Sequence, residues 1–105
     1  MFVSGQLPIA EDGTVLNEAA FEVQARRVLA NVAAALAGAQ SGIGQLLQVR
    51  VYLVDLGQWP AFNQLYEAWA GPARPARAVV PVPALHYGCA LEIEAVALRQ
   101  AGPST

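Results

Sequence analysis

Residues 46–54 read LLQVRVYLV, and this stretch decides the fold class of the chain. Hydrophobic residues occupy every second position on one side of it, namely Leu47, Val49, Val51 and Leu53. The alternate positions are polar or aromatic, namely Gln48, Arg50 and Tyr52. This period of two predicts a strand whose hydrophobic side covers a core. The alternate side is too polar for an ordinary core and needs another explanation.

Two amphipathic helices are expected on either side of this strand. The first is predicted over residues 18–37, with Asn17 as its N-cap and Gly38 as its C-terminal stop. Its hydrophobic residues recur at helical spacing, namely Phe21, Ala25, Val28, Leu29, Val32 and Leu36. The second begins at Trp59-Pro60 and ends at Gly71-Pro72. Its buried stripe is expected to be Phe62, Leu65, Tyr66 and Trp69.

Further strands are predicted at both ends of the chain. Residues 1–7 and 14–16 are expected to form a hairpin around the turn at 11–13. Residues 77–83 and 89–99 read as two more strands joined around Leu85 to Gly88. The order β-β-α-β-α-β-β predicts an α+β fold, a single sheet with two helices packed on one face. A chain of this length is expected to be one domain, residues 1–105.

The composition suggests an oligomer. Hydrophobic residues make up 55% of the chain and charged residues only 13%, too few charges to cover a monomer's surface comfortably. The sheet face opposite the helices is expected to carry charged Arg50, Glu92 and Glu94 among hydrophobic Val96 and Leu98. Such faces turned inward between subunits would hide the hydrophobic groups, so we expect an oligomer with ligands bound between its subunits.

Charge and residue counts give no support to several functions. Six basic and eight acidic residues give a formal charge of −2, which offers no support for nucleic-acid binding. One cysteine, Cys89, and one histidine cannot form an internal disulfide or a zinc site, so no metal is expected. Cys89 alternates with core residues and is expected to be a packing residue. Neither a signal peptide nor a membrane span is recognised, and a cytoplasmic location is expected.

One arginine and one glutamate could carry chemistry. Arg77 opens a predicted strand and Glu92 lies in the next, so a hairpin-like return could bring them to one cleft. A guanidinium can bind a small carboxylate at two points, and a neighbouring carboxylate can orient or deprotonate a water. An ordinary ion pair explains the same two residues on physical grounds alone.

Several motifs in this order resemble those of the RidA (YjgF) family, also called the endoribonuclease L-PSP family. The motifs are Phe2 to Pro8, Gln24 with Asn31, Val51 to Asp55, Phe62-Asn63 with Tyr66, Pro75-Ala76-Arg77, Leu85, Gly88, and Leu91 to Ala97. Their gaps also agree, including fifteen positions from Arg77 to Glu92.

The resemblance implies a chorismate-mutase-like α+β fold and a homotrimer with clefts between its subunits. It also implies hydrolysis of reactive 2-imino or enamine acids to 2-keto acids and ammonia, without a cofactor. Arg77 would bind the substrate carboxylate and Glu92 would position the attacking water. Backbone groups near Gly5 and Val79 would line the cleft. A relative that binds a 2-keto acid without turnover, and a ribonuclease or translation inhibitor, are the alternatives.

The chain departs from the family pattern in three places. Family chains carry a further strand and a tyrosine before the position that Met1 occupies here. Tyr87 or His86 could replace that tyrosine, or both could be ordinary surface residues. Ala78 stands where a serine commonly follows the arginine. The sequence Pro-Ala-Arg occurs twice, at 72–74 and 75–77, and Arg77 is chosen for its spacing to Glu92.

Overall fold

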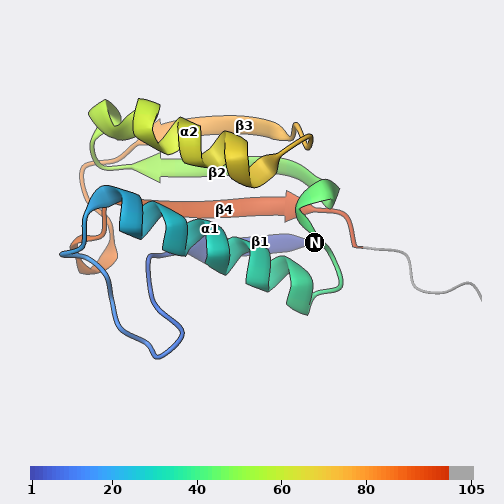
Figure 1. Cartoon of the computed structure of the whole chain (residues 1–105), viewed down its shortest axis with the longest axis horizontal. Helices are drawn as coiled ribbons and strands as arrows, with labels where there is room; N and C mark the ends of the chain where they lie inside the picture. Colours follow the sequence, from blue (N-terminus) through green and yellow to red (C-terminus); the bar gives the residue numbers. More distant parts are fainter. Residues whose placement is uncertain (100–105) are drawn as a thin grey trace, which may run out of the picture.

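A computed structural model describes residues 1–99 as a four-stranded sheet with two helices on one face (Figure 1). The strands lie in the order β1-β4-β2-β3. Their bounds are Phe2–Gln6 for β1, Leu46–Leu53 for β2, Ala76–Pro81 for β3 and Leu91–Ala97 for β4. Helix α1 spans Phe21–Gly38, and helix α2 spans Trp59–Ala70. Strand β2 runs parallel to β3 and antiparallel to β4, which confirms the predicted α+β fold.

The core lies between the sheet and the helices. Strands β2 and β4 occupy the middle of the sheet, and alternate residues of both are fully buried. These residues are Val49, Val51, Leu53, Leu91 and Ile93, and they pack with Val28, Val32, Leu36 and Phe62 of the helices. Burying about nine such side chains stabilises the fold by roughly 2 kcal/mol each.

The N-terminal segment differs from the prediction. Residues 14–16 form no strand and make only an isolated bridge between Ile9 and Val15. Helix α1 begins at Phe21 and has no side-chain cap, so Asn17 is not its N-cap. The cause is Gln24, whose Nε2 donates to the carbonyl oxygens of Asn17 and Ala19 at 3.3 and 2.9 Å. These hydrogen bonds hold the chain in a turn ahead of the helix.

Leu47 was expected in the core and is instead 48% exposed. The register between β2 and β4 shifts between Leu46 and Gln48, and Leu46 takes the buried position. An irregularity of this kind reverses the alternation at one end of a strand, which a strict period of two cannot anticipate.

The last two strands are shorter than predicted and do not pair with each other. Strand β2 lies between β3 and β4, so the hairpin-like return expected from Arg77 to Glu92 is wrong. Helix α2 is a crossover between β2 and β3, and a crossover makes these two strands parallel. This connection places β3 at the outer edge and leaves the other side of β2 for β4.

Candidate functional site

The side chain of Arg77 is held by helix α2. Its Nη1 donates to Asn63 Oδ1 at 2.8 Å. Its Cζ lies 4.6 Å from the ring centroid of Trp59 and 4.8 Å from that of Tyr66. A guanidinium between two aromatic faces gains cation–π attraction and loses conformational freedom. Arg77 is therefore oriented before any ligand arrives.

The contacts of Trp59 and Asn63 with Arg77 were not predicted from the sequence. The two residues lie four apart on one helix, a spacing that places both on the same face. The sequence carries that spacing, but it does not show which strand lies beneath the helix. The contact could be found only once β3 was known to lie under α2.

Gly5 and Glu92 were each expected at the cleft, and the structure places them in contact. Strands β1 and β4 are antiparallel neighbours, with Gln6 opposite Ile93. A Cβ added at Gly5 would overlap the Oε1 atom of Glu92. A side chain at position 5 would displace this carboxylate, which lies directly against the backbone of β1.

Arg77 and Glu92 lie on opposite faces of the sheet. Arg77 pairs with Val49, a fully buried residue on the helix side. Glu92 pairs with Tyr52, which alternates with the buried residues of β2 and faces away from the helices. A single chain therefore does not bring the guanidinium and the carboxylate into one cleft.

Val79 lies two residues after Arg77 on the same side of β3, opposite Val51. It lines a shallow hydrophobic hollow together with Leu56, Trp59 and Pro81. This hollow adjoins the Arg77 side chain, because Trp59 contacts both.

Tyr87 lies in the turn between β3 and β4 and is 64% exposed. Its φ of 61° is in the left-handed region, which is uncommon for a residue with a large side chain. The contacts of Tyr87 within residues 1–99 include a tilted pairing with the ring of His86, at 6.1 Å between centroids. None of them joins Tyr87 to Arg77 or to Glu92.

Cys89 is buried, as expected for a packing residue. Burial raises the pKa of its thiol, and the nearby charge of Glu92 adds to the effect. The thiol therefore stays protonated at neutral pH and is a poor nucleophile. Among residues 1–99, His, Cys, Asp and Glu side chains form no group of three that could hold a metal ion.

The sheet face opposite the helices mixes charge with exposed hydrophobic surface. Tyr52 donates its hydroxyl to Glu94 Oε1 at 2.6 Å, and this hydrogen bond raises the pKa of Tyr52. Phe2 is 62% exposed and lines a small hollow with Arg50, Glu94 and Val96. An exposed surface of this kind is typical of a protein contact.

Comparison with known proteins matches residues 1–99 to the profile of the family described as Endoribonuclease L-PSP. The chain belongs to this family. A RutC family protein of Pyrococcus abyssi is 32% identical over 100 residues, covering 95% of this chain and 79% of the relative. TdcF of Escherichia coli, described as a candidate reactive intermediate deaminase, is 32% identical over 105 residues. The match covers 96% of this chain and 80% of TdcF.

Solved structures of L-PSP family proteins share the fold. The structure of Escherichia coli TdcF with bound serine gives a TM-score of 0.86 at 32% identity, covering 94% of this chain and 80% of that one. The structure of the YjgF gene product of the same organism gives a TM-score of 0.86 at 34% identity, with the same coverage of both chains. The chain therefore has the YjgF-like fold that its motifs implied.

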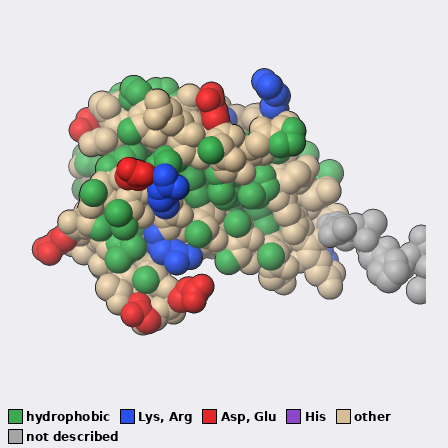
Figure 2. All heavy atoms as spheres, viewed as in Figure 1, with side chains coloured by type: hydrophobic (Ala, Val, Ile, Leu, Met, Phe, Trp, Pro, Cys, Tyr) green, Lys and Arg blue, Asp and Glu red, His purple; other side chains and the backbone are tan. Residues whose placement is uncertain are grey.

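The structure also bears on the expectations about nucleic-acid binding and membrane spans. Acidic and basic side chains are interspersed on the helix-bearing face (Figure 2), so this face offers no continuous positive surface for a nucleic-acid backbone. Within the described residues, neither helix is long and hydrophobic enough to cross a membrane.

Proposed function

We propose that the protein hydrolyses reactive 2-imino or enamine acids to 2-keto acids and ammonia. Arg77 binds the substrate carboxylate and Glu92 positions the attacking water. Gly5, Val79 and Tyr87 contribute to the walls of the cleft. An imine carbon is already electrophilic, so holding the substrate and water in place accounts for most of the task. The proposal of a small amino-acid-like ligand is supported by the structure of TdcF, which contains bound serine.

The observation that carries the proposal is that Arg77 is held in place but has no acidic partner among the described residues. Trp59, Asn63 and Tyr66 hold its guanidinium, yet no carboxylate within residues 1–99 forms a salt bridge with it. The ordinary ion pair with Glu92 is therefore not formed in a single chain. A positioned cation without a protein counter-ion is suited to an anionic ligand.

The site is completed between subunits in this proposal. Arg77 lies on β3 and Gly5 on β1, and these strands are the two opposite edges of the sheet. In a closed ring, the β3 edge of one subunit meets the β1 edge of its neighbour. Arg77 of one chain then approaches Gly5 and Glu92 of the next. A homotrimer also covers the mixed face around Phe2, Tyr52 and Val96.

The direct test is an imine-hydrolysis assay. The purified protein should accelerate loss of 2-iminobutanoate generated in solution, and Arg77→Ala should abolish most of this activity. Arg26→Ala is the matched control, because Arg26 is an exposed arginine of α1 that pairs only with Glu22 among the described residues. No acceleration over the uncatalysed reaction would exclude the deaminase function.

Binding without turnover is a second candidate, favoured by the separation of Arg77 and Glu92 in a single chain. If the subunits do not bring them together, Arg77 can still bind a carboxylate. A 2-keto acid would then raise the thermal midpoint of the protein by mass action, and the imine assay would show no rate enhancement. Loss of the thermal shift in Arg77→Ala would confirm that this arginine is the binding residue.

A further inference from the structure

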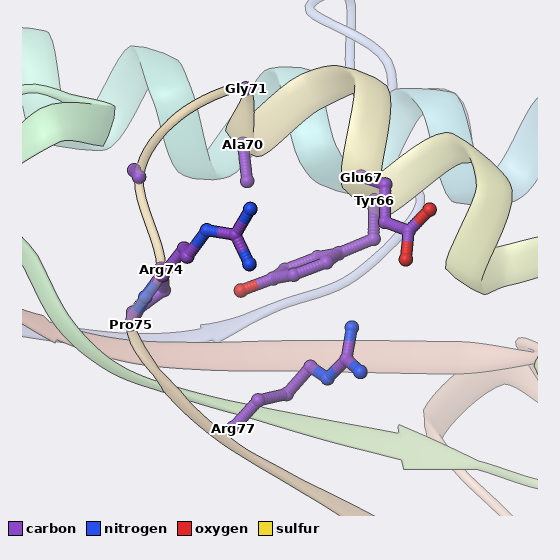
Figure 3. A pocket seen from close by; sticks show the side chains of 8 residues that line it. Tyr66, Glu67, Ala70, Gly71, Arg74, Pro75 and Arg77 are labelled. Atoms are coloured by element: carbon purple, nitrogen blue, oxygen red, sulfur yellow. The ribbon is translucent and has the colours of Figure 1, made fainter.

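A cavity of about 550 Å³ lies between the C-terminal end of α2 and the start of β3 (Figure 3). Its polar walls come from Tyr66 and Glu67 on the helix and from Arg74 and Arg77. Arg77 is thus shared with the proposed reaction site, and the ring of Tyr66 holds it there. Arg74 and the hydroxyl group of Tyr66 have no role in that site. Both copies of the Pro-Ala-Arg repeat turn out to direct an arginine to this one cavity.

The hydroxyl group of Tyr66 has no hydrogen-bond partner in the described structure. Tyr66 is 5% exposed, and its oxygen is fully buried. Figure 3 shows this oxygen directed toward the side chain of Arg74, with Arg77 beneath the ring. A buried hydroxyl without a partner costs free energy, and a ligand that accepts its hydrogen bond recovers that cost. Burial also raises the pKa of Tyr66, so the hydroxyl remains a donor at neutral pH.

The charges of the cavity specify the charge of its ligand. Arg74 and Arg77 are cationic, and neither forms a salt bridge within residues 1–99. Glu67 is the acidic side chain of the lining, and its Oε1 accepts a hydrogen bond from Asn63 Nδ2 at 3.2 Å. Two guanidinium groups and one carboxylate leave a single positive charge in excess. A monoanion balances it, whereas a dianion or a neutral molecule does not.

We propose that this cavity binds a small 2-oxo or 2-imino monocarboxylate, with its carboxylate between Arg74 and Arg77 and its C2 oxygen or nitrogen accepting from Tyr66. The choice of ligand rests on the proposed function, and the assignment of Arg74 and Tyr66 as specificity residues goes beyond it. Arg74 adds a second guanidinium to the carboxylate site. Tyr66 distinguishes an acid with an acceptor at C2 from a plain carboxylic acid.

Calorimetric titration with 2-oxobutanoate and with butanoate tests this assignment. The wild type should bind 2-oxobutanoate about five- to tenfold more tightly than butanoate, because only the former accepts from Tyr66. Tyr66→Phe should bind the two acids equally. It should also raise the thermal midpoint of the ligand-free protein, since it removes a buried hydroxyl without a partner. Arg74→Gln should weaken the binding of both acids about tenfold. Arg26→Gln makes the same change in charge and is the control, and it should leave the binding of both acids unchanged.

The outcomes separate this inference from the deaminase function. Unchanged discrimination in Tyr66→Phe, or unchanged affinity in Arg74→Gln, would show that the cavity is not the binding site, even if imine hydrolysis is observed. The expected losses of binding in a protein that does not hydrolyse imines would establish the cavity and exclude the reaction. No binding of either acid to the wild type would overturn the inference.

Discussion

At the scale of single residues, the site depends on how Arg77 is positioned. Its guanidinium is fixed by a hydrogen bond to Asn63 and by the faces of Trp59 and Tyr66, all from α2. Arg77 is otherwise an exposed side chain at a sheet edge, where a flexible arginine would lose more entropy on binding. Helix α2 thus acts on the ligand through the arginine.

Asn63→Ala should release Arg77 without changing its charge. We expect the KM for the imino acid to rise about fivefold, with a small effect on kcat, since the substrate must then order the guanidinium itself. Steady-state kinetics at saturating and limiting substrate measure both constants. Gln64→Ala, at the exposed neighbouring position of the same helix, is the control. An unchanged KM in Asn63→Ala would mean that the hydrogen bond does not position Arg77.

Gly5→Ala should displace the carboxylate of Glu92. The added Cβ would overlap Glu92 Oε1, so either the side chain or strand β1 must move. We expect kcat to fall about tenfold or more, because a water held by Glu92 would lose its position. Gly44→Ala is the matched control, since an added Cβ there meets no atom within 4 Å. Equal activity in the two variants would argue against a role for this contact.

At the scale of elements, two amide side chains connect helix α1 to the neighbouring loops. Gln24 is 3% exposed, and its Oε1 accepts from the backbone N–H of Ala90 at 2.9 Å while its Nε2 donates to Ala19. Asn31 donates to the carbonyl oxygens of Leu7 and Ile9 at 3.0 and 2.9 Å. Helix α1 is thereby tied to the segments next to β1 and β4, the two strands that carry Gly5 and Glu92.

Gln24→Ala should destabilise the protein by about 2–4 kcal/mol, since it leaves buried backbone groups without partners and opens a small cavity. Urea unfolding followed by circular dichroism gives the free energy of unfolding. Gln64→Ala makes the same chemical change at an exposed helical position, and we expect less than about 0.5 kcal/mol there. A comparable loss in both variants would refute the structural role of Gln24.

The elements show what the sequence could and could not predict. The period of two in β2 and β4 and the helical spacing of α1 and α2 depend on local sequence, and all four elements were predicted. Strand neighbours depend on long-range packing, so β3 was wrongly expected beside β4. The family resemblance assigned Gly5 and Glu92 to one cleft, and the structure places these two residues in contact. The resemblance could not show that Arg77 faces α2, because a side chain's direction depends on the register of an edge strand.

At the scale of the whole molecule, the open sheet face is the expected subunit contact. Phe2 is more than half exposed there and lines a hollow with hydrophobic Val96 and charged Arg50 and Glu94. The helices cover only the opposite face (Figure 1), so nothing within residues 1–99 shields these hydrophobic groups. In the proposed trimer, this face and the sheet edges are buried together.

Val96→Asp should dissociate the trimer, since it adds a charge to the centre of the expected contact. Light scattering at micromolar concentration should give about three times the 11.0 kDa chain mass for the wild type and one chain mass for the variant. Val23→Asp, at an exposed position of α1, should remain a trimer. A wild-type protein that is monomeric would contradict the interface.

The most direct measurement combines two inactive variants in one assembly. Arg77→Ala and Glu92→Gln are each expected to be inactive, and they are refolded together at equal concentration so that their subunits mix. If Arg77 of one subunit acts with Glu92 of its neighbour, about a quarter of the sites in a random mixture keep both residues. The mixture should then recover up to about a quarter of the wild-type rate of imine hydrolysis. No recovery in verified mixed trimers would show that the two residues do not meet across the interface.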